Sequence, residues 1–316
     1  MTGIEIILYL AGGLVMLFLG AEGLIRGSSN LAIKIGITPL VVGLTVVAFG
    51  TSAPELVVSL NAALKGNSSI SLGNVVGSNI ANIALILGTA ALIKPLNVHS
   101  KVIMREIPIM IGISALLLLL LIDGEVGFVD GLIFVIGLIA YLIFNVITAR
   151  KEKNPEVEEE FKEGLKSRLG IPVSIFIMIA GLGLLILGAN LFVQSAVAIA
   201  KIFNVSDAII GLTIVAIGTS LPELITSIVA SYKKEADIAI GNVVGSNVFN
   251  ILCILGITSL IIPTSTVGIG YIDLGVMLFT AVILFPLSRT GFSISRLEGA
   301  FMLAGYIGYI YYLIPK

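Results

Sequence analysis

Long apolar segments separated by short polar stretches dominate the chain. A membrane-spanning helix needs about 20 mostly apolar residues, and ten segments meet this requirement. They lie at residues 3–25, 38–64, 70–93, 104–122, 127–149, 171–193, 206–231, 237–262, 271–288 and 297–314. The pattern predicts an all-α membrane protein with ten transmembrane helices. The first segment lacks a basic leader and a small-residue cleavage site, so we expect a membrane helix there rather than a cleaved signal.

Composition supports lipid as the solvent of this protein. The chain is 57% hydrophobic and only 12% charged, whereas a soluble domain carries about 25% charged residues. Its net charge of −1 argues against nucleic acid as a partner. One cysteine, Cys253, and one histidine, His99, cannot form a Cys/His metal cluster. We expect His99 to be a solvated residue of a charged loop.

The distribution of positive charge predicts the orientation. All but three of the 18 Lys and Arg residues lie in loops that follow odd-numbered segments, the exceptions being Lys65, Lys201 and Lys316. Because cytoplasmic loops collect Lys and Arg, we place the odd loops in the cytoplasm and both termini outside. The one long charged connection, residues 150–170, is predicted to be a cytoplasmic linker.

The chain repeats itself at an offset of 168 residues. Residues 43–56 match residues 211–224 with three differences in 14, and residues 73–83 match residues 241–251 with two differences in 11. We therefore predict a first five-helix repeat at 1–149, the linker at 150–170 and a second repeat at 171–316. Because five is odd, the second repeat crosses the membrane in the opposite direction. Such inverted repeats are typical of secondary transporters, whose sites lie near the midplane.

Each repeated block places a glutamate after a proline, deep inside predicted helices two and seven. These residues are Glu55 and Glu223. A carboxylate inside a membrane helix is costly and indicates function. Proline cannot donate to the carbonyl four residues earlier, so we expect both helices to break there. In helix two, the break is predicted to free the carbonyls of Ala48, Gly50 and Thr51 for a cation.

A local explanation also fits these residues. The spacings Ser52 to Glu55 and Ser220 to Glu223 match a capping box, in which the serine caps the following half-helix. This accounts for how the second half-helix starts. It does not account for a carboxylate at mid-depth in two membrane helices.

Predicted helices three and eight each carry a polar stripe with a spacing of four residues. The stripes are Asn74, Ser78, Asn82 and Asn242, Ser246, Asn250. Glycines beside them form a small-residue motif that permits close helix contact, at Gly73, Gly77, Gly241 and Gly245. Together with the two glutamates, the stripes predict an all-oxygen site for hard cations. Calcium accepts six to eight oxygens in flexible geometry, and two carboxylates balance one divalent ion. Sodium ions competing for the same oxygens would couple counter-transport.

The motif G-T-S-x-P-E in segments two and seven, with G-N-x-x-G-S-N-x-x-N in segments three and eight, resembles the α-repeats of the calcium:cation antiporter superfamily. The match is closest to prokaryotic sodium/calcium exchangers. The resemblance implies electrogenic exchange of three sodium ions for one calcium ion by alternating access. It also implies a protein of the prokaryotic inner membrane that functions as a monomer. Calcium and sodium would be substrates, with no cofactor.

The resemblance further implies a set of ion ligands. Glu55 and Glu223 would bind calcium directly, with backbone carbonyls from Thr51 and Thr219. The sodium sites would use Ala48, Thr51, Ser78, Ala216, Thr219 and Ser246, and further site-lining positions would be Ser52, Ser220, Asn82 and Asn250.

Three other functions are alternatives to sodium/calcium antiport. Position 250 is asparagine, where potassium-dependent relatives carry an acid, so we expect no potassium requirement. Proton-coupled or other divalent-cation antiport would use the same scaffold, but that branch has a G-N-x-x-E motif around its glutamates. A cation channel is the alternative from another class. An intramembrane hydrolase lacks support, because Ser52 has no base near it except Glu55, and we expect no enzyme activity.

Overall fold

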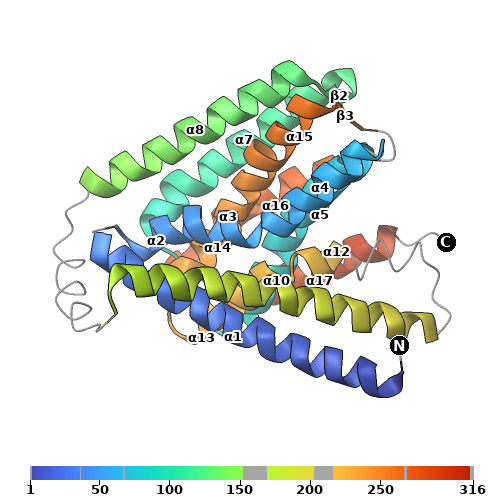
Figure 1. The fold of residues 1–316 in the computed structure, drawn as a ribbon. Helices are drawn as coiled ribbons and strands as arrows, with labels where there is room; N and C mark the ends of the chain where they lie inside the picture. Colours follow the sequence, from blue (N-terminus) through green and yellow to red (C-terminus); the bar gives the residue numbers. More distant parts are fainter. Residues whose placement is uncertain are drawn as a thin grey trace.

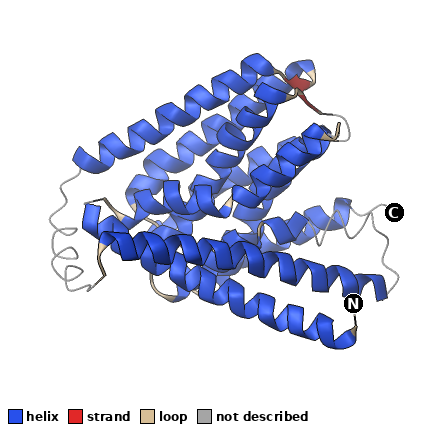
Figure 2. Cartoon of the chain, viewed as in Figure 1, coloured by secondary structure: helices blue, strands red, loops and turns tan. Residues whose placement is uncertain are grey.

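The computed structural model describes residues 2–35, 37–66, 68–151, 169–202, 216–266 and 269–313. These residues are almost entirely helical (Figure 2), as predicted. The first half comprises α1 (Gly3–Ile35), α2 (Pro39–Val42), η1 (Gly43–Val47), α3 (Ala48–Thr51), α4 (Ala53–Leu64), α5 (Ser68–Ile80), η2 (Ala81–Leu87), α6 (Gly88–Ile93), β1 (Leu96–Asn97), η3 (Val102–Glu106), α7 (Ile107–Leu120), η4 (Leu121–Asp123), β2 (Glu125–Val126) and α8 (Phe128–Lys151). The second half comprises α10 (Ile171–Ile202), α12 (Ala216–Thr219), α13 (Leu221–Tyr232), α14 (Ala236–Phe249), η6 (Asn250–Leu255), α15 (Gly256–Ile261), β3 (Thr264–Ser265), α16 (Tyr271–Arg289), η7 (Thr290–Phe292), β4 (Ser293–Ile294) and α17 (Arg296–Leu313).

Within the described residues, seven helices are long and apolar enough to cross a membrane, and a bent pair of helices makes an eighth. They coincide with predicted segments one to six, eight and nine. The first ten residues of the seventh predicted segment, 206–215, lie outside the described residues, as do residues 152–168 of the predicted linker. The tenth segment forms the helix α17, which is not among these candidate spans. Besides four tyrosines, α17 carries the charged residues Arg296 and Glu298 in its first turn.

The second span is broken in the middle, as its proline predicted. Ser52, between α3 and α4, has φ −82° and ψ 3°, and the helices on its two sides differ in direction by 43°. Pro54 is the second residue of α4, a position where its missing N–H leaves no intrahelical bond unmade. The same break lies between α12 and α13, where Ser220 has φ −88° and ψ 7° and Pro222 is again the second helical residue.

The repeat found in the sequence is also visible in the element boundaries. Three pairs of helices, α3 and α12, α4 and α13, and α6 and α15, begin and end 168 residues apart. The strands follow the same offset, because β1 and β3, and likewise β2 and β4, lie 168 residues apart. Strand β1 pairs antiparallel with β4, and β2 pairs antiparallel with β3, so each half contributes one strand to each ladder. These strands were not predicted, because two residues are too short to show an alternating pattern.

The interior and exterior are arranged as lipid would require. Residues 238–256, which run from α14 through η6 to the start of α15, are all buried at the centre. The surrounding helices α1, α8 and α10 run along the edges of the molecule (Figure 1) and expose large apolar side chains, such as Ile4 at 73% and Phe176 at 71%. Apolar surface of this extent is unstable in water and stable against hydrocarbon.

Helices α1 and α10 lie side by side along much of their length (Figure 1) and meet through glycines. A Cβ atom added at Gly181 of α10 would lie 2.5 Å from the backbone nitrogen of Leu24 and 2.7 Å from the carbonyl oxygen of Gly20. A Cβ atom at Gly188 would lie 2.8 Å from the carbonyl oxygen of Gly13. Only glycine permits backbones to approach this closely.

Candidate functional site

The two helix breaks bring Glu55 and Glu223 into one buried cluster. Each glutamate lies in the first turn of its half-helix, and each is only 1% exposed. The hydroxyl of Ser52 donates to Oε1 of Glu223 at 2.9 Å, and the hydroxyl of Ser220 donates to Oε1 of Glu55 at 3.1 Å. The bonds are crossed, because each serine serves the glutamate of the other repeat.

This arrangement corrects the capping-box interpretation. Neither Ser52 nor Ser220 makes a side-chain hydrogen bond that caps its own helix. Their hydroxyls are instead directed across the interface between the repeats. The backbone carbonyls at the break have hydrogen-bond partners. Backbone N–H groups at the break donate to the carbonyls of Ala48 and Gly50, and the hydroxyl of Thr51 lies 3.3 Å from the Ala48 carbonyl. The prediction that proline frees these two carbonyls is wrong, because the tightened turn at Ser52 supplies other donors.

Several buried oxygens around the glutamates have no hydrogen-bond partner among the described residues. They are Oε2 of Glu55, Oε2 of Glu223, Oδ1 of Asn82 and Oδ1 of Asn250. A buried polar atom without a partner costs about 1–3 kcal/mol, and more when it carries charge. These four acceptors form a set that a cation would satisfy. The hydroxyl of Ser246 is also buried without a partner among the described residues.

The remaining predicted site residues lie on the same four helical segments. Thr51 donates to Oδ1 of Asn242 at 3.0 Å, and the hydroxyl oxygen of Ser78 lies 3.4 Å from that of Ser220. Ser246 is fully buried on α14. Ala48 begins α3 and Ala216 begins α12, and Thr51 and Thr219 end these two helices immediately before the breaks.

Two pairs of residues support the site from outside the ligand set that the resemblance implied, although the two asparagines belong to the predicted stripes. The amide of Asn74 donates to the backbone carbonyl of Glu55 at 3.3 Å and to Ser59 at 3.0 Å. The amide of Asn242 makes the equivalent bonds to the carbonyl of Glu223 at 3.4 Å and to Ser227 at 3.2 Å. Each asparagine thus anchors a half-helix just after the break. The serines could have been found in the sequence, because each follows its glutamate by four residues in both repeats.

The predicted glycine contacts are confirmed on α14. A Cβ atom at Gly245 would lie 2.7 Å from the carbonyl oxygen of Leu44, and one at Gly241 would lie 3.0 Å from that of Leu40. Helix α14 therefore packs directly on the first half of the broken second span. For Gly73 and Gly77, the repeat-related partners would be residues 208 and 212, which lie outside the described residues.

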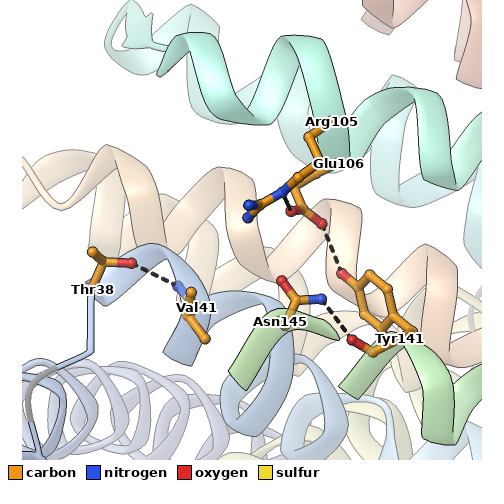
Figure 3. Close-up of polar contacts among 6 residues, drawn as sticks. All are labelled: Thr38, Val41, Arg105, Glu106, Tyr141 and Asn145. Atoms are coloured by element: carbon orange, nitrogen blue, oxygen red, sulfur yellow. Dashed lines mark hydrogen bonds and ion pairs between the residues drawn. The ribbon is translucent and has the colours of Figure 1, made fainter. Parts of the chain in front are cut away.

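A third buried carboxylate, Glu106, differs from the two site glutamates in being fully paired. Figure 3 shows Oε1 of Glu106 accepting from Nε of Arg105 at 2.6 Å and Oε2 accepting from the hydroxyl of Tyr141 at 3.2 Å. Tyr141 also accepts, through its backbone carbonyl, a bond from Asn145 at 3.0 Å. The sequence indicated only that Glu106 begins a span. In the structure its carboxylate is paired with the neighbouring Arg105, so we assign Glu106 a structural role.

The fold and the site together define an integral membrane protein with a buried, oxygen-rich, doubly acidic centre between two related halves. The profile of the sodium/calcium exchanger protein family matches residues 5–147 and 173–314, and the chain belongs to this family of antiporters.

Relatives and solved structures agree with this assignment. The chain is 38% identical over 309 residues to the putative antiporter CaxA of Alkalimonas amylolytica, covering 96% of this chain and 97% of that protein. It is 32% identical to the sodium/calcium exchanger MaX1 of Methanosarcina acetivorans, covering 94% and 95% of the two chains. A structure of the sodium-calcium exchanger NCX_Mj, soaked with sodium and calcium, superimposes with a TM-score of 0.86 at 31% identity and covers 100% of both chains.

Proposed function

We propose that this protein is an electrogenic sodium/calcium antiporter that exchanges three sodium ions for one calcium ion by alternating access. The observation that carries the proposal is the pair of crossed serine–glutamate bonds between the repeats. Each bond occupies one oxygen of a carboxylate, and the second oxygen of each glutamate is buried without a partner among the described residues. Two half-occupied carboxylates match the charge of one calcium ion.

The proposed calcium ligands are Glu55 and Glu223, with backbone oxygens of Thr51 and Thr219. Sodium ions would use the same carboxylates together with the remaining predicted positions, which are Ala48, Ala216, Ser52, Ser220, Ser78, Ser246, Asn82 and Asn250. Two ionised glutamates without a cation would carry a charge of −2 through a low-dielectric interior, at a large desolvation cost. The protein would therefore change from one access state to the other only when cations occupy the site, and this couples the movement of sodium to that of calcium.

The proposed topology has ten spans in two inverted repeats, 1–149 and 171–316, joined by a cytoplasmic linker at 150–170. Contacts between distant loops support it. Lys233 bonds Glu22 at 2.6 Å, and His99 lies 3.4 Å from Asp237, so these contacts join only positions assigned to the cytoplasmic face. The start of α1, the end of α17 and the β2–β3 ladder lie toward one end of the molecule, and the end of α8 lies toward the other (Figure 1). We place the protein in the prokaryotic inner membrane as a monomer without a cofactor.

The test is sodium-gradient-driven uptake of radioactive calcium by the purified protein in sodium-loaded proteoliposomes. Uptake that requires the outward sodium gradient supports antiport, and uptake that ignores it would indicate a channel. Glu55→Gln and Glu223→Gln should each abolish gradient-driven uptake, because each removes a charge that balances calcium. Wild-type uptake in either variant would reject the proposed site. His99→Ala, at a side chain that is 66% exposed, is the control and should transport normally.

A further inference from the structure

Four asparagines form a closed set of hydrogen bonds between the two repeats, and two of them lie outside the proposed ligand set. Asn79 and Asn82 belong to α5 and η2, and Asn247 and Asn250 belong to α14 and η6. The side chains of Asn79 and Asn247 donate to each other's backbone carbonyls at 3.4 and 3.3 Å. All four residues are at most 2% exposed.

The side-chain oxygens of this inner pair serve the outer pair. Oδ1 of Asn79 accepts from Nδ2 of Asn250 at 2.9 Å, and Oδ1 of Asn247 accepts from Nδ2 of Asn82 at 2.9 Å. Each inner asparagine thus uses its amide nitrogen to hold the opposite backbone and its amide oxygen to hold the opposite outer asparagine. The bonds are crossed between the repeats, like those of the serines and glutamates.

This arrangement fixes the direction of two amide groups. An amide held by its nitrogen has its oxygen on the other side of the same plane. The oxygens of Asn82 and Asn250 are the ones buried without a partner among the described residues. Asn30 and Asn145 also bury an amide oxygen without a partner, so position must distinguish a ligand. Asn82 and Asn250 each follow a predicted ligand, Ser78 or Ser246, by four residues, which places them on the same helix face.

We propose that Asn79 and Asn247 are positioning residues that aim the amide oxygens of Asn250 and Asn82 at the transported cation. This inference rests on the proposed function and extends it to two residues that would not themselves touch the ion. The proposal also explains why Asn79 and Asn247 donate to each other's backbone carbonyls. These bonds hold each inner side chain in the orientation that presents its oxygen to the outer asparagine. The hydrogen bonds orient the amide oxygens of the outer asparagines in advance, so these ligands need not reorganise when a cation binds.

The pairing predicts which substitutions are coupled. Asn79 acts through Asn250 and Asn247 acts through Asn82, in both cases across the repeats. The same-helix pairs, Asn79 with Asn82 and Asn247 with Asn250, have no bond between their side chains in the structure's hydrogen-bond pattern. Residues that share one interaction give non-additive effects, and residues that do not share one give additive effects.

The experiment measures the KM for calcium and the thermal midpoint of purified, reconstituted full-length variants. Asn79→Ala and Asn250→Ala should each raise the KM about five- to tenfold, with the double variant close to the larger single effect. Asn79→Ala combined with Asn82→Ala should instead multiply the two effects. The same measurements on Asn247→Ala and Asn82→Ala repeat the test for the second crossed pair. They replace the Asn79 variants if those variants do not fold.

Asn145→Ala is the matched control, because Asn145 is a fully buried asparagine of α8 that bonds to the carbonyl of Tyr141 away from the site. It should lower the thermal midpoint without changing the KM. The inference is overturned alone if the unaltered protein exchanges calcium and Asn79→Ala behaves like this control, or if Asn79 and Asn250 prove additive. Absence of calcium uptake by the unaltered protein would overturn the proposed function and this inference together.

Discussion

The hydroxyl of Ser52 lies 2.9 Å from Oε1 of Glu223, although the two residues are 171 positions apart in the chain. The bond joins the break of one half to the acidic residue of the other, and Ser220 returns it to Glu55. Each carboxylate is thereby held at one oxygen by the opposite repeat. Movement of one broken helix relative to the other would alter both halves of the site at once.

Removing either crossed hydroxyl should weaken calcium binding without abolishing exchange. Ser52→Ala leaves the carboxyl group of Glu223 in place but less firmly held. We therefore expect the KM for calcium to rise about 10- to 150-fold, the effect of losing one hydrogen bond to a charged group, about 1.5–3 kcal/mol. Ser52→Thr keeps the hydroxyl and should remain closer to the unaltered protein. Calcium uptake measured across a concentration series checks this, and equal KM values for Ser52→Ala and the unaltered protein would contradict it.

The glycine contact between α1 and α10 should be sensitive to a single methyl group. Gly181→Ala places a Cβ atom 2.5 Å from the nitrogen of Leu24, which the two backbones can accommodate only by separating. We expect a loss of about 1–3 kcal/mol, read as a lower thermal midpoint of the purified protein. Gly183→Ala on the same helix is the control, because a Cβ atom there meets nothing within 4 Å. Equal midpoints for the two variants would show that the contact is looser than described.

The Glu106 cluster should affect stability and leave ion affinity alone. Tyr141→Phe removes the 3.2 Å bond to the buried carboxylate, so we expect a destabilisation of about 1–3 kcal/mol with an unchanged KM for calcium. Asp273, bonded to Tyr309 at 2.9 Å, is the comparable pair in the second half, and Tyr309→Phe should act in the same direction. A changed calcium KM in Tyr141→Phe at normal stability would assign Glu106 to the transport machinery.

The proposed orientation can be tested by labelling single cysteines in sealed right-side-out vesicles. In a Cys253→Ala background, Lys65→Cys should react with a membrane-impermeant maleimide from outside, because its loop is assigned to that face. His99→Cys should react only after the membrane is permeabilised. Both native side chains are exposed, so access to the side chain itself does not limit either reaction. Reaction of His99→Cys in sealed vesicles would invert the assignment.

Much of the fold was determined by the sequence, because a bilayer restricts the choices. Segments of about 20 apolar residues form helices there, since only a helix satisfies its own backbone bonds in hydrocarbon. The proline before Glu55 predicted the break at Ser52, and the 168-residue offset predicted matching element boundaries in the two halves. These are local or periodic properties, which a chain carries before it folds.

Tertiary structure decided the partners of the polar groups. The same Ser52-x-x-Glu55 spacing permits a capping box, yet the hydroxyl binds Glu223, because folding places a charged acceptor from the other repeat within reach. The burial of Glu106 could not be predicted from its position at the start of a span. It follows from the fold, which brings the carboxylate into contact with Arg105 and Tyr141. Hydrogen bonds between groups 165 or more residues apart leave no periodic trace in a sequence, so which buried oxygens are paired and which are left for a cation is settled when the two halves meet.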